Sequence, residues 1–170
     1  LVKEIRERLN FDIKELNLGG GFGATYTDEE RKPFSYFIEP MMNKIRAFCE
    51  KEDMKLPSLV VEPGRSLVAE AGITLYTVGR IKDIKGVRKY VSVDGGMFDN
   101  IRPALYRASY SGTVANKADF PNDEKVTVCG KCCESGDILF KDYMIPAETK
   151  TGDLLATFST GAYGYSMAFN

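Results

Sequence analysis

Apolar residues in the first third of the chain alternate between helical and strand-like spacing. In residues 1–9 an aliphatic side chain recurs every four positions, which predicts the tail of a helix. Residues 14–18 read as a short strand that runs into the glycine-rich stretch 19–23, and residues 56–62 read as a buried strand. Helices that alternate with short apolar strands favour a parallel sheet or a (β/α) barrel.

A second helix is predicted between these two strands. Apolar side chains at 41, 42, 45, 48 and 49 fall at helical spacing. We expect Pro40 to open this helix, because proline fits the first turn of a helix and breaks its interior. The acidic residues 28–30 also suit a helix start, where negative charge is favourable.

From about residue 72 the pattern becomes that of a β protein. Strand-like runs separated by turn-rich stretches cover residues 73–84, 87–93, 125–129 and 153–158. Lys85-Gly86 between the first two runs is a hairpin signal. We therefore expect two domains, residues 1–71 and residues 72–170, with the second built from antiparallel strands.

Composition and charge exclude several classes of protein. Apolar residues make up 44% of the 170 residues, enough for a core, and the 23 basic residues are balanced by 24 acidic ones. This balance argues against a nucleic-acid partner. No apolar run approaches the ~20 residues that cross a bilayer, and residues 1–9 do not form a signal peptide. A cytoplasmic protein is expected, and a start without Met in mid-helix suggests a fragment.

The cysteines and the absence of histidine narrow the possible chemistry. Four cysteines are present: Cys49, Cys129, Cys132 and Cys133. They are too few for a disulfide-built fold, and without histidine a four-ligand zinc site would need all of them, so no metal is expected. A redox pair is possible, although Cys129 falls on a predicted strand. A reactive Cys133 beside Glu134 and Asp137 is the stronger reading, and a buried cysteine in a polar turn is the plain alternative.

Two turns after predicted strands could hold a cofactor. Peptide N–H groups of the triple glycine 19–21 can approach an anion closely, and a helix dipole soon after would help; a tight turn is the alternative. Glu62 is followed by Pro63, Gly64 and Arg65, at a strand end where barrel enzymes gather their sites. The carboxylate could pair with a protonated ring nitrogen, or the segment is a surface loop with an ion pair.

Three further residues could contact a substrate. Arg102 follows the Asp94-Gly95-Gly96 turn and can bind a carboxylate through two parallel hydrogen bonds, with the Tyr106 hydroxyl beside it. An exposed arginine of no special role is the alternative. Tyr163, between small residues, could project against a ligand or serve as an amphiphilic core residue.

Each of these motifs is ambiguous by itself, but their order along the chain resembles that of a known family. GGGFG, EPGR, DGGM with RPALY, CCESGD and GAYGYSM follow one another from about Leu16 to Asn170. This series resembles the fold type III, alanine-racemase-like pyridoxal-phosphate (PLP) decarboxylases, and CES with RPALY is similar to their diaminopimelate decarboxylase branch. The resemblance implies the C-terminal part of a PLP-binding (β/α)8 barrel, followed by a β-rich, Greek-key-like domain. It also implies decarboxylation of meso-2,6-diaminopimelate to L-lysine.

Residue roles follow from this resemblance. Gly20 and Gly21 would hold the PLP phosphate, with backbone contacts from Gly64 and Arg65, and Glu62 would pair with the pyridinium nitrogen. A carboxylate there keeps the ring nitrogen positive, which stabilises the carbanion left after CO2 departs.

The resemblance assigns the substrate side as well. A substrate carboxylate would be bound by Arg65, Arg102 and Tyr106. Cys133 would be the proton donor, Glu134 would read the distal ammonium group, and Tyr163 would contact cofactor and substrate. The cysteine loop would reach the neighbouring subunit's site, which implies a homodimer.

The chain departs from the family pattern at both ends. The Schiff-base lysine and the histidine that stacks on the ring belong upstream of Leu1, and a last strand belongs beyond Asn170. We therefore expect this polypeptide by itself to be inactive. A related basic amino-acid or polyamine-precursor decarboxylase, or a non-catalytic PLP-binding relative, are the alternatives.

Overall fold

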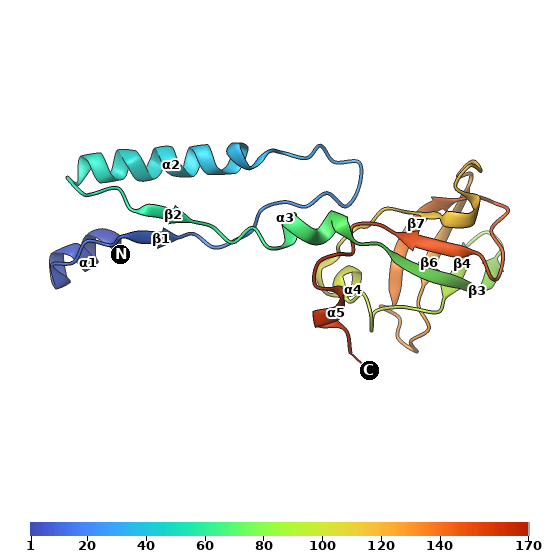
Figure 1. Ribbon diagram of the computed structural model, residues 1–170. Helices are drawn as coiled ribbons and strands as arrows, with labels where there is room; N and C mark the ends of the chain where they lie inside the picture. Colours follow the sequence, from blue (N-terminus) through green and yellow to red (C-terminus); the bar gives the residue numbers. More distant parts are fainter. Residues whose placement is uncertain (170) are drawn as a thin grey trace. The chain divides into compact units, whose positions relative to one another are not determined.

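The computed structural model describes residues 1–169, which form two compact units (Figure 1). The α/β unit comprises residues 1–23 and 30–66, and the sheet unit comprises residues 24–29 and the chain from Leu67 onward. The division into domains after residue 71 stays a prediction.

The α/β unit follows the predicted order of helix, strand, helix, strand. Its elements are α1 (Val2–Leu9), β1 (Glu15–Asn17), α2 (Phe34–Lys51) and β2 (Ser58–Val60). β1 and β2 pair in parallel with Leu16 opposite Leu59, and α2 runs alongside both strands (Figure 1). This is a two-stranded sheet, and residues 1–169 contain no closed barrel of parallel strands.

The start of α2 corrects the prediction for Pro40. The helix begins at Phe34, after Pro33 in an extended conformation, so Pro40 lies inside the helix. Proline lacks an N–H, so the turn around Pro40 misses one backbone hydrogen bond, and the helix continues past it. Residues 28–30 are not helical, so the acidic run does not open a helix.

After β2 the described chain contains six strands and five short α-helical or 3-10 segments. These elements are α3 (Arg65–Val68), η1 (Ala69–Ala71), β3 (Thr74–Ile84), β4 (Arg88–Val93), α4 (Arg102–Tyr106), β5 (Gly112–Val114), η2 (Ala115–Lys117), β6 (Glu124–Cys129), β7 (Ile138–Ile145), β8 (Leu154–Thr157) and α5 (Gly164–Met167).

The sheet unit is built on a six-stranded mixed sheet in the order β5-β8-β3-β4-β6-β7. The predicted hairpin of β3 and β4 is confirmed, with Gly86 in the left-handed region (φ 74°) at its turn. The prediction of a wholly antiparallel domain is wrong, because β4 and β6 pair in parallel. The long connection between them, through α4 and β5, lets the chain cross over before it returns alongside β4.

The burial pattern of each strand agrees with its place in the sheet. β3 and β4 alternate between buried and more exposed residues, as strands with one covered face do. β6 lies between two neighbours and buries three consecutive residues, Val126, Thr127 and Val128. Tyr143 on β7 bridges to β5, because its hydroxyl donates to the Gly112 carbonyl and accepts from the Gly112 N–H, both at 2.8 Å.

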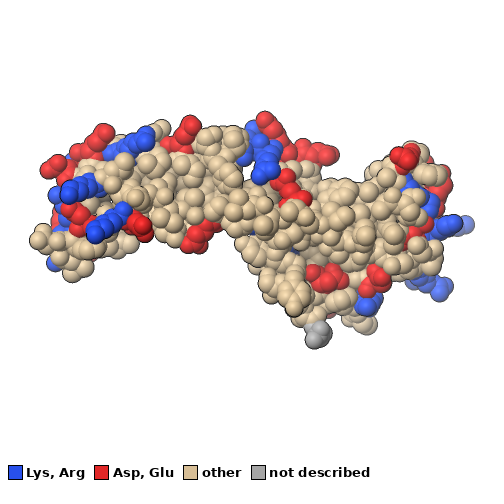
Figure 2. Space-filling model, viewed as in Figure 1, with Lys and Arg blue, Asp and Glu red and all other residues tan. Residues whose placement is uncertain are grey.

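The surface matches the balanced composition. Figure 2 shows acidic and basic side chains interspersed on the face in view, without a broad region of one sign. Among the helices of residues 1–169, none has the length and apolar character that a membrane span requires.

Candidate active site

The glycine turn and Glu62 come together at one end of the small parallel sheet. Parallel strands bring their carboxyl ends to the same edge, and the Glu62 N–H donates to the Gly19 carbonyl at 2.7 Å. Gly19 and Gly21 have φ of 72° and 90°, which favours glycine. A Cβ on Gly20 would lie 2.5 Å from the Glu62 carbonyl oxygen. The two turns therefore touch through backbone atoms, where no side chain fits.

Asn17 joins these two turns through its side chain, and the sequence reading missed it. Its Nδ2 donates to Glu62 Oε1 at 2.6 Å, and its Oδ1 accepts from the Gly19 N–H at 2.7 Å. The signal was available, since Asn17 is the last residue of a strand and stands two residues before the first glycine. The amide thus holds the Glu62 carboxylate in a fixed direction relative to the glycine turn.

This corner has the features that a phosphate-bearing cofactor needs. Space is open at the Cβ position of Gly21, so peptide N–H groups there can be approached without hindrance. The turn around Gly64 is closed by Ser66, whose N–H and hydroxyl both donate to the Pro63 carbonyl. A helix does not follow the glycines directly, because α2 begins only at Phe34. The prediction that a helix dipole assists anion binding at the glycine turn is therefore wrong.

Arg102 is buried, which excludes the alternative of an ordinary exposed arginine. The residue is 9% exposed, and its guanidinium carbon lies 5.7 Å from the Tyr26 ring centre and 5.2 Å from that of Tyr106. Aromatic faces attract such a cation. Within the described residues, the buried Arg102 Nε has no hydrogen-bond partner. A buried donor of this kind is suited to an incoming acceptor.

The cysteine loop presents Cys133 and Glu134 to solvent. Cys133 is exposed, so the alternative of a buried cysteine in this turn is wrong for it, while Cys132 is half-buried. Hydrogen bonds from the Gly136 N–H and the Ser135 hydroxyl lower the pKa of Glu134, which therefore stays a carboxylate. All the cysteines are free thiols, and residues 1–169 contain no group of three or more side chains placed to hold a metal ion.

Two thiols near this loop, those of Cys132 and Cys129, have a pKa above the ordinary value. Burial, and then the negative charge of Asp137, raise the pKa of the Cys132 thiol. The pKa of Cys129 is raised by the same two causes. These two thiols therefore stay protonated, and the exposed Cys133 is the one available to a ligand.

Tyr163 lies at the start of α5 in an unusual backbone conformation. Its φ of 62° is left-handed, and its side chain is 48% exposed, which is not the environment of a core residue. The following segment returns to the turn after β4, where the Phe169 N–H donates to the Phe98 carbonyl at 2.9 Å.

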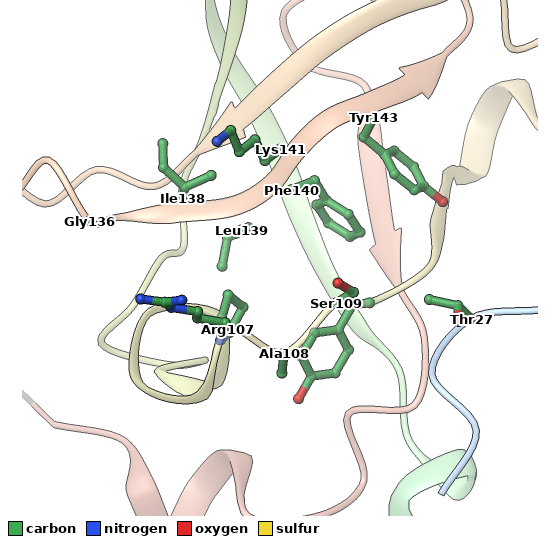
Figure 3. Close-up of a pocket in the computed structure, with 12 residues that line it drawn as sticks. Thr27, Arg107, Ala108, Ser109, Gly136, Ile138, Leu139, Phe140, Lys141 and Tyr143 are labelled. Atoms are coloured by element: carbon green, nitrogen blue, oxygen red, sulfur yellow. The ribbon is translucent and has the colours of Figure 1, made fainter. Parts of the chain in front are cut away.

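A cavity of about 670 Å³ opens between α4 and the start of β7 (Figure 3). Figure 3 shows Leu139 between Lys141 and Arg107, with Phe140 beside it. None of the predicted site residues lines it, although Pro103 directly follows Arg102 and Arg107 directly follows Tyr106. The sequence reading gave no signal for this cavity.

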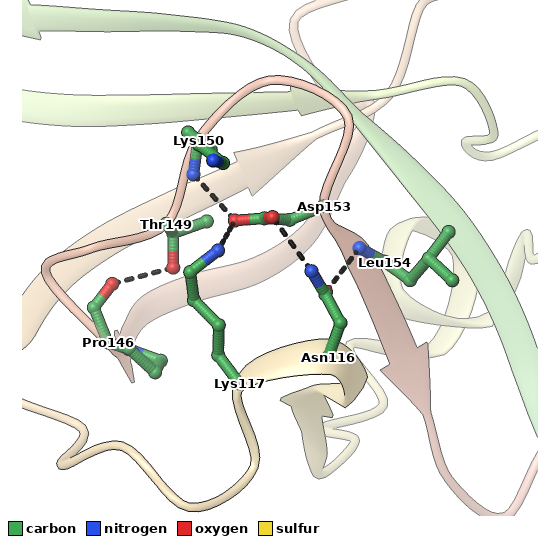
Figure 4. A network of polar contacts seen from close by, with 7 residues as sticks. All are labelled: Asn116, Lys117, Pro146, Thr149, Lys150, Asp153 and Leu154. Atoms are coloured by element: carbon green, nitrogen blue, oxygen red, sulfur yellow. Dashed lines mark hydrogen bonds and ion pairs between the residues drawn. The ribbon is translucent and has the colours of Figure 1, made fainter.

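A second buried carboxylate of the sheet unit, that of Asp153, is held by a network of hydrogen bonds (Figure 4). Asp153 is 2% exposed and accepts from Asn116 Nδ2 at 2.9 Å, from the Lys150 N–H at 2.7 Å and from the ammonium of Lys117. Burial opposes ionisation, but these donors, led by Lys117, outweigh it and lower the pKa of Asp153 to about 2. The network ties η2 to the loop before β8.

Comparison with known proteins assigns the chain to a family. Residues 21–161 match the family described as "Pyridoxal-dependent decarboxylase, C-terminal sheet domain". The chain belongs to this family. The resemblance drawn from the motif order is thereby confirmed at the level of the family.

Individual members of the decarboxylase family are closely similar. The chain is 51% identical over 170 residues to diaminopimelate decarboxylase of Bacillus methanolicus, covering 99% of this chain and 39% of that protein. It is 52% identical over 168 residues to that of Bacillus subtilis, covering 98% and 38%. The crystal structure of diaminopimelate decarboxylase from M. jannaschii in co-complex with L-lysine superposes with a TM-score of 0.84 at 37% identity, covering 99% and 38%. The chain thus spans well under half the length of these relatives.

Proposed function

We propose that this chain is part of a PLP-dependent decarboxylase that converts meso-2,6-diaminopimelate to L-lysine and CO2. Its relatives at about half identity are diaminopimelate decarboxylases. In this proposal the α/β unit is the end of a (β/α)8 barrel that binds the cofactor, and the sheet unit is the second domain.

The α/β unit would hold the cofactor. Peptide N–H groups of Gly20 and Gly21 would bind the phosphate, with Gly64 and Arg65 adding backbone contacts. Glu62, held by Asn17, would keep the ring nitrogen protonated. When bound, pyridoxal phosphate supplies an electron sink for the electron pair that remains when CO2 leaves.

The buried Arg102 carries the proposal for the substrate. A guanidinium with an unpartnered Nε fits a carboxylate, which satisfies it with two parallel hydrogen bonds. Meso-diaminopimelate has a second carboxylate far from the reacting one, and L-lysine and L-ornithine do not. Tyr106 and Arg65 would assist in binding substrate carboxylate, and the ionised Glu134 would pair with the distal ammonium.

The exposed cysteine loop would complete the site. Cys133 would deliver the proton that replaces CO2, because a thiol is a competent general acid. Tyr163 would contact cofactor and substrate. We propose a homodimer in which this loop serves the neighbouring subunit's site, which its exposure permits.

Substrate profiling of the full-length protein with PLP tests the assignment. We expect L-lysine from meso-diaminopimelate and no turnover of L-lysine or L-ornithine. Arg102→Ala is expected to lower kcat/KM by about 10²- to 10³-fold, because a buried charge pair loses one partner. Preference for L-ornithine with little effect of Arg102→Ala would favour a related decarboxylase, and PLP binding without turnover would favour a non-catalytic relative.

The 170-residue chain by itself is expected to be inactive, because none of its residues matches the Schiff-base lysine that the family implies. Incubation of this polypeptide with PLP and meso-diaminopimelate is expected to yield no L-lysine. Turnover would contradict the proposed role of residues outside this chain.

A further inference from the structure

Asp137 is a buried carboxylate at the base of the cysteine loop. It is 3% exposed, and its oxygens accept from peptide N–H groups: Met97 donates to Oδ1 at 2.7 Å, and Cys132 donates to Oδ2 at 2.8 Å. Burying a carboxylate costs free energy unless it is hydrogen-bonded. These two bonds therefore fix the distance between the turn after β4 and the loop after β6.

Two glycines make room for this carboxylate. A Cβ on Gly96 would lie 2.7 Å from Asp137 Oδ1, and a Cβ on Gly130 would lie 2.2 Å from Oδ2. Both glycines follow strands that pair in parallel, so the two turns lie at the same edge of the sheet. The Lys131 N–H joins them again by donating to the Gly95 carbonyl at 3.1 Å. Any other residue at either glycine would displace the Asp137 side chain.

The same residue also closes the loop through its main chain. The Asp137 N–H donates to the Glu134 carbonyl at 3.1 Å, and the Asp137 carbonyl accepts from the Gly130 N–H at 3.0 Å. Cys133 and Glu134 thus stand between one anchor at Cys132 and another at Asp137. Their side chains are exposed, but the backbone on both sides of them is tied to one buried residue.

We propose that Asp137 is a positioning residue that sets the direction of the Cys133 thiol and the Glu134 carboxylate through the peptide N–H groups of Met97 and Cys132. The inference rests on the proposed function, in which Cys133 and Glu134 act on the substrate. Asp137 itself touches neither substrate nor cofactor in this account. Burial, and then the charge of Asp137, raise the pKa of the adjacent Cys132 thiol, whereas Cys133 differs from it in being exposed.

Asp137→Asn in the full-length holoenzyme tests the proposal. An amide offers one acceptor oxygen, and its NH2 group would face a peptide N–H, so one of the two anchoring bonds is lost. We expect kcat with meso-diaminopimelate to fall between about 10- and 100-fold, as small misplacements of catalytic groups do. Alkylation of Cys132 by iodoacetamide is expected to begin at lower pH, because the negative charge beside it is gone.

Asp153→Asn is the matched control. Asp153 is buried to the same degree and also accepts a peptide N–H, but its network lies at η2 and the loop before β8. This variant is expected to lower Tm while kcat stays within about twofold of wild type and Cys132 alkylation is unchanged. Equal effects of the two variants on kcat at equal loss of Tm, or an unchanged kcat in folded Asp137→Asn, would overturn the proposal.

Two further measurements keep the inference testable if Asp137→Asn does not fold. In wild-type holoenzyme, hydrogen exchange of the Cys132 and Met97 amides is expected to be at least about tenfold slower than that of the Cys133 amide; equal rates would overturn the proposal. Cys133→Ala separates it from the proposed function. If that variant keeps wild-type turnover, the proposed role of the loop is wrong, whereas an inactive Cys133→Ala with an unaffected, folded Asp137→Asn refutes the positioning role alone.

Discussion

The two units hold their candidate functional groups in contrasting ways. In the α/β unit Glu62 is an exposed side chain held by one side-chain bond from the exposed Asn17. In the sheet unit Arg102 and Asp137 are buried, and Asp137 anchors the loop through two peptide N–H groups. The sheet unit therefore holds its candidate groups with its own core, whereas the candidate groups of the α/β unit are exposed.

Packing explains this contrast. The buried residues of the α/β unit are Phe22, Cys49, Pro57 and Ser66. A two-stranded sheet is marginally stable in water unless more strands or helices cover it. The core cluster of the sheet unit instead draws on all six strands of its sheet, β3 to β8. We expect the geometry at Glu62 to depend on parts of the protein outside this chain, and the geometry at Asp137 to depend on the sheet unit.

Loss of the thiol is expected to have the largest effect. In full-length Cys133→Ala we expect kcat to fall by about 10²- to 10⁴-fold, because general acid catalysis contributes that much. Steady-state decarboxylation measures it. Cys49→Ala, the same change at a buried cysteine of α2, is the control and is expected to leave kcat within about twofold of wild type. Equal activity of the two variants would contradict the role of the loop.

Removal of the charge at Glu62 ranks next. Glu62→Gln retains an oxygen for Asn17 but loses the negative charge that would stabilise a protonated ring nitrogen. We expect kcat to fall by about 10²- to 10³-fold with an altered absorption spectrum of the bound cofactor. Glu15→Gln, on exposed β1, is the control. A fully active Glu62→Gln would contradict the proposed role of Glu62 at the cofactor.

Asn17→Ala sharpens the comparison, because it tests the single side-chain bond that holds Glu62. The expected loss in kcat is about tenfold, the worth of one hydrogen bond to a charged group. The assay is the same, with Asn43→Ala on the surface of α2 as control. No loss would mean that residues outside this chain orient Glu62.

The prediction with the smallest effect on activity concerns stability at acid pH. It tests the sheet unit alone. The pKa of Asp153 is about 2 in the folded chain and about 3.9 when unfolded. Its contribution is thus complete above the unfolded value and is lost as pH falls toward the folded one. We expect Tm to fall below pH about 4 in wild type and less steeply in Asp153→Asn, as followed by circular dichroism. Parallel curves would contradict the network in Figure 4.

The sequence predicted those features that depend on local pattern. The spacing of apolar residues found α1, β1, β2 and the β3–β4 hairpin, and the motif order found the family. It failed at Pro40, which α2 includes because the helix already begins at Phe34 after Pro33, and at β4–β6, whose parallel pairing depends on a crossover far from either strand. The bond from Asn17 to the Glu62 side chain and the bond from the Met97 N–H to Asp137 each join segments at least 40 residues apart, so these partners become visible only in three dimensions.

One experiment tests most directly our central proposal, in which residues of both units serve one active site across a homodimer. Full-length Glu62→Gln and Cys133→Ala, each expected to be strongly impaired by itself, are unfolded and refolded together with PLP. Random pairing gives mixed dimers in which one site has both native residues, so about a quarter of wild-type activity is expected to return. Absence of any recovery, in dimers shown to have exchanged subunits, would contradict the shared site.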